Sequence, residues 1–394
     1  MSADNIREDE EETLSPQNNP DLFGHEQAEG SLHAAWVSGH LHHAWLLSGP
    51  EGIGKATLAY RFARFLLSQG KQNTKRVGTA SESDLFTLDG SSGPEGVPSQ
   101  GLFLDPRSRL FQRVAAGGHA DLLTVTRSLD LNTKKLRSKI VVDDVRRISS
   151  FLHMTAAEGG ARVVIIDPGD EMNRNAANAL LKGLEEPPNN TVILIVSHTP
   201  WRLLPTIRSR CLGLRLAPLG EADFATVIAR LQPSLGTQEL AMLFRLSGGS
   251  PGKATRLLKE GGLELYHEVL ELLSTLPDDT GGRRGTIDTA ALHALADRVV
   301  GKKGEATYLT VVDILSSWIS RLIRLGVGHV GDKAVAWPEE SPVMHSFLAV
   351  ASLDQWLEVW DNLEALFAQT DGLNLDRRQA ILNAFFNLEK AVRA

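Results

Sequence analysis

Short apolar runs alternate with amphipathic stretches through the first 218 residues of the chain. An apolar run of about four to eight residues between turn signals is typical of a buried strand. Such runs predict strands at 43–48, 122–126, 140–142, 162–167 and 191–197. Apolar residues at helical spacing predict a helix that Lys55 opens, and another from Val145 to about Met154, capped by Asp143 or Asp144. A third is predicted over 173–186, where Pro187-Pro188 stops it.

The alternation of strands and helices predicts a parallel sheet covered on both faces. After Pro218 no strand pattern follows, so residues 219–260 predict a small helical unit and residues 261–394 a larger helical domain. The fold class expected is therefore α/β followed by all-α. A Gly/Pro/Ser-rich stretch at about 70–118 is interpreted as a mobile insertion in the first domain.

Composition places the chain among soluble globular proteins of two or three domains. It has 394 residues, of which 42% are hydrophobic and 23% charged. No apolar run reaches the roughly 20 residues that span a bilayer, and the N-terminus lacks the pattern of a secretory signal. The single cysteine, Cys211, leaves no partner for an intramolecular disulfide and excludes a multi-cysteine zinc site, so no metal is expected. These features favour a cytoplasmic location.

Charge is unevenly distributed along the chain. Residues 1–18 hold six acidic residues and one arginine, which predicts a disordered acidic arm. The net charge is −7, so the rest of the chain is close to neutral and has no general positive field for nucleic acid. A local basic cluster, Lys134, Lys135, Arg137 and Lys139, is interpreted either as a DNA contact or as a solvated strand edge.

Residues 49–55 match the first seven positions of the phosphate loop, G-x-x-x-x-G-K. The glycines Gly49, Gly52 and Gly54 would let backbone N–H groups wrap phosphate oxygens, and Lys55 would meet the β/γ charge. The loop lies between a predicted strand and a predicted helix, as this chemistry requires. The alternative is a glycine-rich turn with an exposed lysine. With these glycines and this lysine, the loop could bind ATP or ADP without hydrolysis.

Two positions argue against hydrolysis. Ala56 stands where a Ser or Thr hydroxyl would bind Mg²⁺, and Thr57 should point away because it lies about 100° further round the helix. Asp167 ends a strand where a second carboxylate would hold the metal through water, but Pro168 follows it instead of a glutamate. Asp170 and Glu171 are interpreted as charges at the start of the next helix.

Four segments together carry a resemblance to a known family. They are HHAWLLSGPEGIGKATLA at 42–59, NALLKGLEEPP at 178–188, LLPTIRSRC at 203–211 and LSGGSPGKA at 246–254. The chain resembles the clamp-loader branch of the AAA+ ATPases, most closely its delta-prime family, over about residues 19–260. The resemblance implies an AAA+ domain over 19–218, a helical lid over 219–260 and a helical oligomerisation collar over 261–394. Residues 261–394 resemble the family only in being helical.

The resemblance also implies roles for individual residues. Arg210, between Ser209 and Cys211, corresponds to an arginine finger that acts on ATP in the neighbouring subunit; an ion pair within its turn is the alternative. Ser197 or His198 would lie near the first sensor, or satisfy the loop backbone. Gly252 replaces the arginine of the second sensor, with Lys253 beside it as a surface charge. Cys211 is interpreted as packing material, and the zinc module of many relatives cannot form.

The function expected is that of a non-hydrolysing clamp-loader subunit. The resemblance implies membership of the DNA polymerase III holoenzyme, a DNA-directed DNA polymerase and nucleotidyltransferase complex, in chromosomal replication, without ATPase or polymerase activity of the chain itself. The implied partners are the gamma/tau motor subunits, the delta subunit, the sliding clamp and primed DNA. An active ATPase of the same fold is the alternative, and a phosphate-loop kinase is a weaker one.

Overall fold

The computed structural model describes residues 15–70, 101–130, 136–276, 286–301, 304–328, 336–373 and 375–393. The chain divides into two compact units, which end and begin at Leu219 and Gly220. Most of the predicted acidic arm and residues 71–100 of the predicted insertion lie outside the described residues. The carbonyls of Gln17 and Asn19 accept hydrogen bonds from the buried Arg64 guanidinium, so this unit has fixed contacts from Gln17 onward.

The first unit is built on a five-stranded sheet with the order β2-β3-β4-β1-β5, in which every neighbouring pair is parallel. This confirms the α/β class predicted for the first part of the chain. Four of the strands lie where apolar runs predict them, and β5 was not predicted. The strands are β1 (Ala44–Ser48), β2 (Leu122–Val125), β3 (Arg162–Ile166), β4 (Thr191–Ser197) and β5 (Leu212–Arg215).

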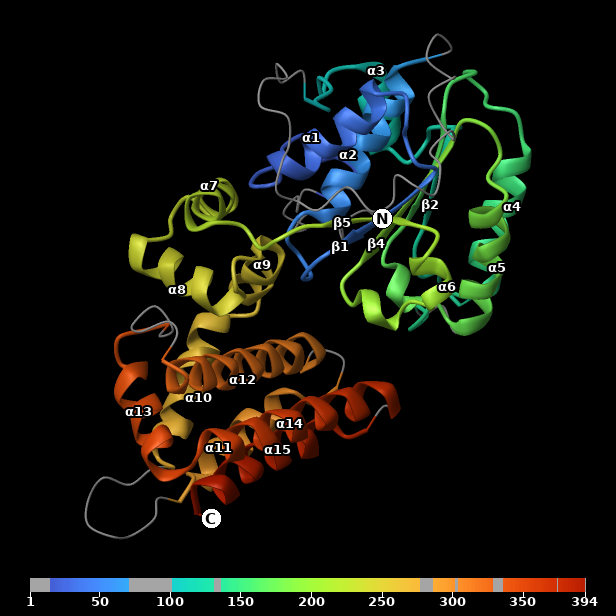
Figure 1. Cartoon of the computed structure of the whole chain (residues 1–394). Coiled ribbons are helices and arrows are strands. Elements are labelled where there is room, and N and C mark those ends of the chain that lie inside the picture. The colour runs from blue at the N-terminus through green and yellow to red at the C-terminus, as the bar shows by residue number, and fades with distance from the viewer. Residues whose placement is uncertain are drawn as a thin grey trace, which may run out of the picture. The chain divides into compact units, whose positions relative to one another are not determined.

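Helices cover both faces of this sheet (Figure 1). On one face α4 (Val142–His153) and α5 (Arg174–Glu185) pack over Leu46, Val164 and Ile195. On the other lie α2 (Lys55–Ser68), with α1 (Glu26–Val37) and α3 (Arg109–Ala115) beside it. Every residue of β3 and β4 is buried, because both faces of these central strands are covered.

The prediction of a strand at 140–142 is wrong. Ile140 forms only a single bridge, to Met172, and α4 already begins at Val142. Asp144 does not cap a later helix start. Its carboxylate accepts from the backbone N–H of Val141 at 3.0 Å, which fixes the helix start before Val142. The helix predicted over 173–186 is confirmed as α5, and the Asn173 side chain caps it by accepting from the N–H of Ala176 at 2.8 Å.

The last part of the predicted insertion is not irregular. Residues 101–118 contain α3, whose Phe111 and Val114 are buried together with Leu102. The Arg64 guanidinium lies 4.4 Å from the centre of the Phe111 ring, so this segment packs against α2. Its few apolar side chains are separated by polar ones, which hides the packing from a search for apolar runs.

The second unit is helical throughout its described residues, as predicted. The expected boundary between lid and collar near residue 260 stays a prediction. None of the described helices combines the length and apolarity that a bilayer crossing would need. The helices are α7 (Glu221–Leu231), α8 (Thr237–Ser247), α9 (Pro251–Lys259), α10 (Gly262–Ser274), α11 (Thr289–Arg298), α12 (Gly304–Gly326), α13 (Glu340–Val350), α14 (Leu353–Leu373) and α15 (Arg377–Arg393).

Candidate functional site

The glycine-rich loop connects β1 to α2 at the carboxyl edge of the sheet. Gly49, Gly52 and Gly54 have φ angles of 150°, 74° and 104°, a region that favours glycine. At Gly49 a Cβ would lie only 2.4 Å from the carbonyl oxygen of Leu216, so this position also needs glycine for space. The residue at the N-terminal cap of α2 is Gly54, so no capping side chain accepts a hydrogen bond from the N–H groups of the first turn. Backbone of this kind suits an anion.

Lys55 is buried at the start of α2 and turned onto its own loop. Its Nζ donates to the carbonyl oxygen of Gly49 at 2.7 Å and also to that of Pro50. Burial lowers the pKa of Lys55 to about 8, although Asp167 and Asp170 act in the opposite direction. The Lys55 ammonium therefore has hydrogen-bond acceptors within its own loop and does not need a ligand to supply them. A phosphate at the loop would have to compete with these two carbonyls for it.

His25 supports the loop from outside the motif. This buried side chain donates from Nε2 to the carbonyl oxygen of Ile53 at 2.6 Å, and its ring lies 3.5 Å from the position of a Cβ at Gly54. No motif in the sequence indicates this contact, because His25 belongs to the start of α1. A histidine shortly before a phosphate loop gives no signal on its own.

Asp167 follows β3 and lies near Lys55. Burial raises the pKa of Asp167 to about 6, with Lys55 opposing the shift and Asp170 adding to it. Pro168 follows it, so the next side chain carries no carboxylate. Ala56 supplies no hydroxyl, and Thr57 lies largely buried in α2. The residues present do not make a good magnesium site, because Ala56 stands at the hydroxyl position and Pro168 follows Asp167 in place of a second carboxylate.

Asp170 does not charge the start of α5, contrary to the prediction. One carboxylate oxygen accepts from the backbone N–H of His198 at 2.9 Å, and the other from Thr199 Oγ1 at 2.7 Å. The turn η3 (Gly169–Glu171) brings it there, because Gly169 packs so closely on β4 that a Cβ would lie 2.4 Å from Ile195 Cγ2. Glu171 pairs with Arg127 at 2.9 Å. Both carboxylates are therefore engaged elsewhere.

At the end of β4, His198 Nδ1 has no hydrogen-bond partner among the described residues. The Ser197 hydroxyl lies beside the Asp170 carboxylate, where its hydrogen bond helps to lower the pKa of Asp170. Ser197 is paired in register with Ser48, the residue before the phosphate loop. Burial and the neighbouring Lys55 charge lower the pKa of His198.

Arg210 lies in the turn between α6 (Pro205–Arg208) and β5. Its Nη1 donates to the carbonyl oxygen of Thr206 at 3.0 Å, and its Nη2 lies 2.7 Å from Glu185 Oε1 at the end of α5. The side chain keeps 36% of its surface exposed. The ion pair that the sequence allowed is therefore present, with an acid the sequence did not indicate. The guanidinium also remains accessible.

The remaining predicted residues lie in different settings. Cys211 is buried, and burial raises its pKa to about 12, which fits a packing role. Arg137 lies 3.5 Å from Asp130, whereas Lys134 and Lys135 fall outside the described residues. Gly252 and Lys253 belong to the second unit. Lys253 is half-buried, with Nζ 3.9 Å from Asp313 Oδ1, rather than a plain surface charge.

Known proteins resemble this chain over much of its length. A subunit delta' of DNA polymerase III from Pseudomonas aeruginosa is 38% identical over 58% of this chain and 60% of its own length. That of Escherichia coli K12 is 33% identical over 62% of each chain. The Yersinia pestis subunit delta' is 31% identical over 66% of this chain and 71% of its own length. The chain thus spans about three-fifths of the first two relatives it matches.

More distant matches were also found. The E. coli K12 subunit tau is 27% identical over 74% of this chain and 40% of its own length. A solved gamma subunit-related protein from Thermotoga maritima is 18% identical, with a TM-score of 0.34 over 92% of this chain and 99% of that one. The family model described as DNA polymerase III, delta subunit, matches residues 102–220. From the sequence matches, the chain belongs to the family of DNA polymerase III delta' subunits.

Proposed function

We propose that this chain is a clamp-loader subunit that binds ATP or ADP without hydrolysing it and supplies Arg210 to the ATP of a neighbouring subunit. The proposed lack of hydrolysis rests on the surroundings of Asp167 and Asp170. Asp167 is followed by Pro168, and both oxygens of Asp170 are occupied by His198 and Thr199. No described carboxylate next to Asp167 is available to polarise an attacking water.

Nucleotide binding without hydrolysis follows from what the loop retains. The three glycines and the uncapped start of α2 supply backbone groups that can surround phosphates. Ala56 removes the hydroxyl that would help to hold Mg²⁺. Binding would also have to displace the contacts of Lys55 with Gly49 and Pro50. Affinity for nucleotide is therefore expected to be lower than in a motor subunit.

Action in trans is supported by the setting of Arg210. A guanidinium that neutralises charge on a γ-phosphate can contribute about three to five orders of magnitude in rate. The Arg210 side chain is partly exposed, and its one acidic partner, Glu185, is itself 48% exposed. An ion pair this exposed is worth about 0–1 kcal/mol, so a phosphate can replace Glu185 at little cost.

The proposed neighbours are the gamma/tau motor subunits, with the delta subunit completing the ring. Family membership and the matches to gamma and tau relatives support this assignment. Through that assembly the chain would help to place the sliding clamp on primed DNA.

The test compares Arg210 with an arginine at the end of the preceding helix α6, in the reconstituted assembly. Arg210→Ala should lower the ATPase rate that DNA and the clamp stimulate, without preventing assembly. Arg208→Ala is the matched control, because Arg208 is exposed and two residues away. Equal rates for both variants in intact assemblies would refute the role of Arg210.

A separate measurement tests the chain alone. Purified chain should bind labelled ADP and show ATP turnover at background level, and Lys55→Ala should weaken the binding. Turnover well above background that Lys55→Ala abolishes would instead establish the active ATPase alternative.

A further inference from the structure

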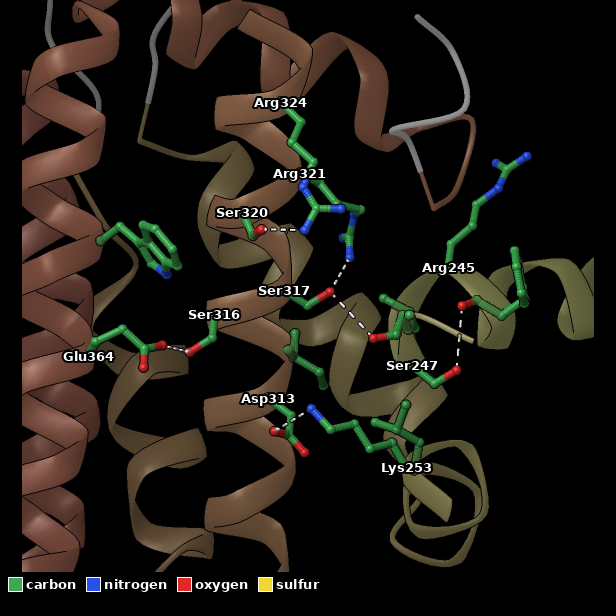
Figure 2. Close-up of a pocket in the computed structure, with 16 residues that line it drawn as sticks. Arg245, Ser247, Lys253, Asp313, Ser316, Ser317, Ser320, Arg321, Arg324 and Glu364 are labelled. Carbon is green, nitrogen blue, oxygen red and sulfur yellow. Dashed lines mark hydrogen bonds and ion pairs between the residues drawn. The ribbon is translucent and has the colours of Figure 1, made fainter. Parts of the chain in front are cut away.

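Ion pairs between segments far apart in sequence differ in how deeply they lie. In the second unit Asp313 of α12 pairs with Lys253 of α9 beside a cavity between the helices (Figure 2). Arg321 and Glu340 of that unit form an interior pair, with side chains 6% and 0% exposed. Removing one partner of such a buried pair would leave a charge without compensation. The Arg321–Glu340 pair is therefore part of the packing of its unit.

The pair of Glu185 with Arg210 in the first unit lies at the surface instead. Its side chains are 48% and 36% exposed, and a pair this exposed contributes about 0–1 kcal/mol to folding. The end of α5 is attached to α6 by apolar packing, because Leu184 and Ile207 belong to the same buried core cluster. The Glu185–Arg210 pair is therefore not needed to hold these two segments together. Its main effect is on the direction and availability of the guanidinium.

Glu185 contacts the nitrogen of Arg210 that a phosphate would need. A guanidinium binds two oxygens of one phosphate through Nε and Nη2 or through Nη1 and Nη2, so Nη2 belongs to both donor pairs. Glu185 Oε1 lies 2.7 Å from Nη2, and Nη1 donates to the carbonyl oxygen of Thr206 at 3.0 Å. A γ-phosphate on the same guanidinium would lie close to the carboxylate, and the two anions would repel each other. Binding of a phosphate by two oxygens therefore favours departure of Glu185.

The end of α5, which carries Glu185, is fixed from the start of the sheet. A helix leaves its last carbonyl groups without partners inside the helix. His43, the residue before β1, donates from Nε2 to one of them, the carbonyl oxygen of Leu184, at 2.9 Å. The His43 ring is half-buried and stacked on that of His42, with ring centres 4.4 Å apart. This contact holds the backbone at the residue next to Glu185.

Given the proposed role of Arg210 in trans, on which this assignment rests, we propose that Glu185 is a resting counter-ion that the γ-phosphate of the neighbouring ATP must displace from Arg210. His43 is the positioning residue that keeps Glu185 within reach. Before ATP binds next door, the carboxylate holds the guanidinium. Because the pair is weak, it raises the ATP concentration needed to engage Arg210 without preventing engagement.

The experiment measures ATP hydrolysis by the reconstituted assembly, with DNA and clamp, over a range of ATP concentrations. Glu185→Gln keeps the size of the side chain and removes its charge. It should lower the ATP concentration at half-maximal rate by about two- to fivefold, because a pair worth up to about 1 kcal/mol no longer competes. Glu186→Gln is the matched control, since Glu186 is the next residue and is also exposed. That control should leave the half-maximal concentration unchanged.

His43→Ala tests the positioning role. It should lower the half-maximal ATP concentration in the natural chain and have no further effect in the Glu185→Gln chain, because both changes act on one pair. His43→Gln retains an N–H that can donate to Leu184, so it should restore the natural value. A general loss of structure would not be rescued in this way.

The outcomes separate this proposal from the role of Arg210 itself. If Arg210→Ala slows hydrolysis but Glu185→Gln behaves like Glu186→Gln, only the counter-ion proposal is overturned. A higher half-maximal concentration for Glu185→Gln also overturns it, because Glu185 would then assist phosphate binding. If Arg210→Ala hydrolyses ATP at the natural rate, the proposed function and the counter-ion proposal are both overturned.

Discussion

Glu185 Oε1 lies 2.7 Å from Arg210 Nη2, so the last residue of α5 holds the arginine of the α6–β5 turn within the same chain. Both side chains are more than one-third exposed. Water screens such a pair, and its net contribution to folding is small. The pair orients the Arg210 guanidinium at the surface of the first unit but holds it there only weakly. A second anion can therefore compete for it on equal terms.

Replacing Arg210 by lysine should keep the positive charge but lose the planar guanidinium group. Lysine presents a single ammonium, which cannot bind two phosphate oxygens in the planar geometry of arginine. In the reconstituted assembly, ATP hydrolysis at the site that Arg210 is proposed to complete should slow by about tenfold or more. The stability of the isolated chain should change by less than about 1 kcal/mol, as measured by urea unfolding. A fully active lysine variant would show that only charge is needed.

Gly169→Ala should destabilise the first unit by about 1–3 kcal/mol, because overpacking forces neighbouring atoms to move. The new Cβ would lie 2.4 Å from Ile195 Cγ2 of the central strand β4. Gly213→Ala is the control, since nothing lies within 4 Å of a Cβ there. Urea unfolding of both variants checks this. Equal free energies of unfolding for the two variants would mean that β4 can shift to accept the new Cβ without strain.

Asp167→Asn should change how stability depends on pH. Burial raises the pKa of Asp167 from 3.8 to about 6, so the folded chain keeps this proton where the unfolded chain has lost it. As pH rises from about 4 to about 6, the free energy of unfolding of the natural chain therefore falls. Two pKa units correspond to about 3 kcal/mol.

Asparagine does not titrate, so the variant should gain stability relative to the natural chain over that pH range, by up to about 3 kcal/mol. Urea unfolding at about pH 4.5 and pH 7 measures the difference between the two proteins, in which the other titrating groups largely cancel. A difference that does not depend on pH would show that Asp167 is ionised throughout.

Cys211 should react very slowly with thiol reagents in the folded chain. Its side chain is buried, and its pKa of about 12 leaves almost no thiolate at pH 8. The reaction should be slower than in the urea-unfolded chain by about a thousandfold or more. Because the chain has a single cysteine, absorbance from a chromogenic disulfide reagent reports this site alone. Fast reaction of the folded chain would mean that the α6–β5 turn opens readily.

The sequence predicts the centre of the sheet well and its margins poorly. β3 and β4 are apolar at every position or nearly so, because both of their faces are covered. β5 lies at the sheet edge, where exposed residues alternate with half-buried ones in a strand of four, and it leaves little pattern. The segment 140–142 has the apolar residues of a strand, but Asp144 captures the N–H of Val141 and begins a helix there.

At the candidate site, the sequence predicts which positions match a motif, but it does not predict which residues those side chains contact. The positions of Gly49, Lys55, Asp167 and Arg210 follow from spacing and from the family resemblance. The contact of Glu185 with Arg210 depends on how the end of α5 faces a later turn, which spacing cannot show. The role of Asp170 depends on the turn at Gly169, which directs its carboxylate toward the end of β4 rather than toward α5.

The lysine that donates to the carbonyl oxygens of Gly49 and Pro50 gives the loop an internal substitute for a ligand. Folding of the loop should therefore not depend on nucleotide. We therefore expect the cellular amount of folded subunit to be insensitive to the ratio of ATP to ADP, so that in the proposed assembly the energy supply would act through the other subunits.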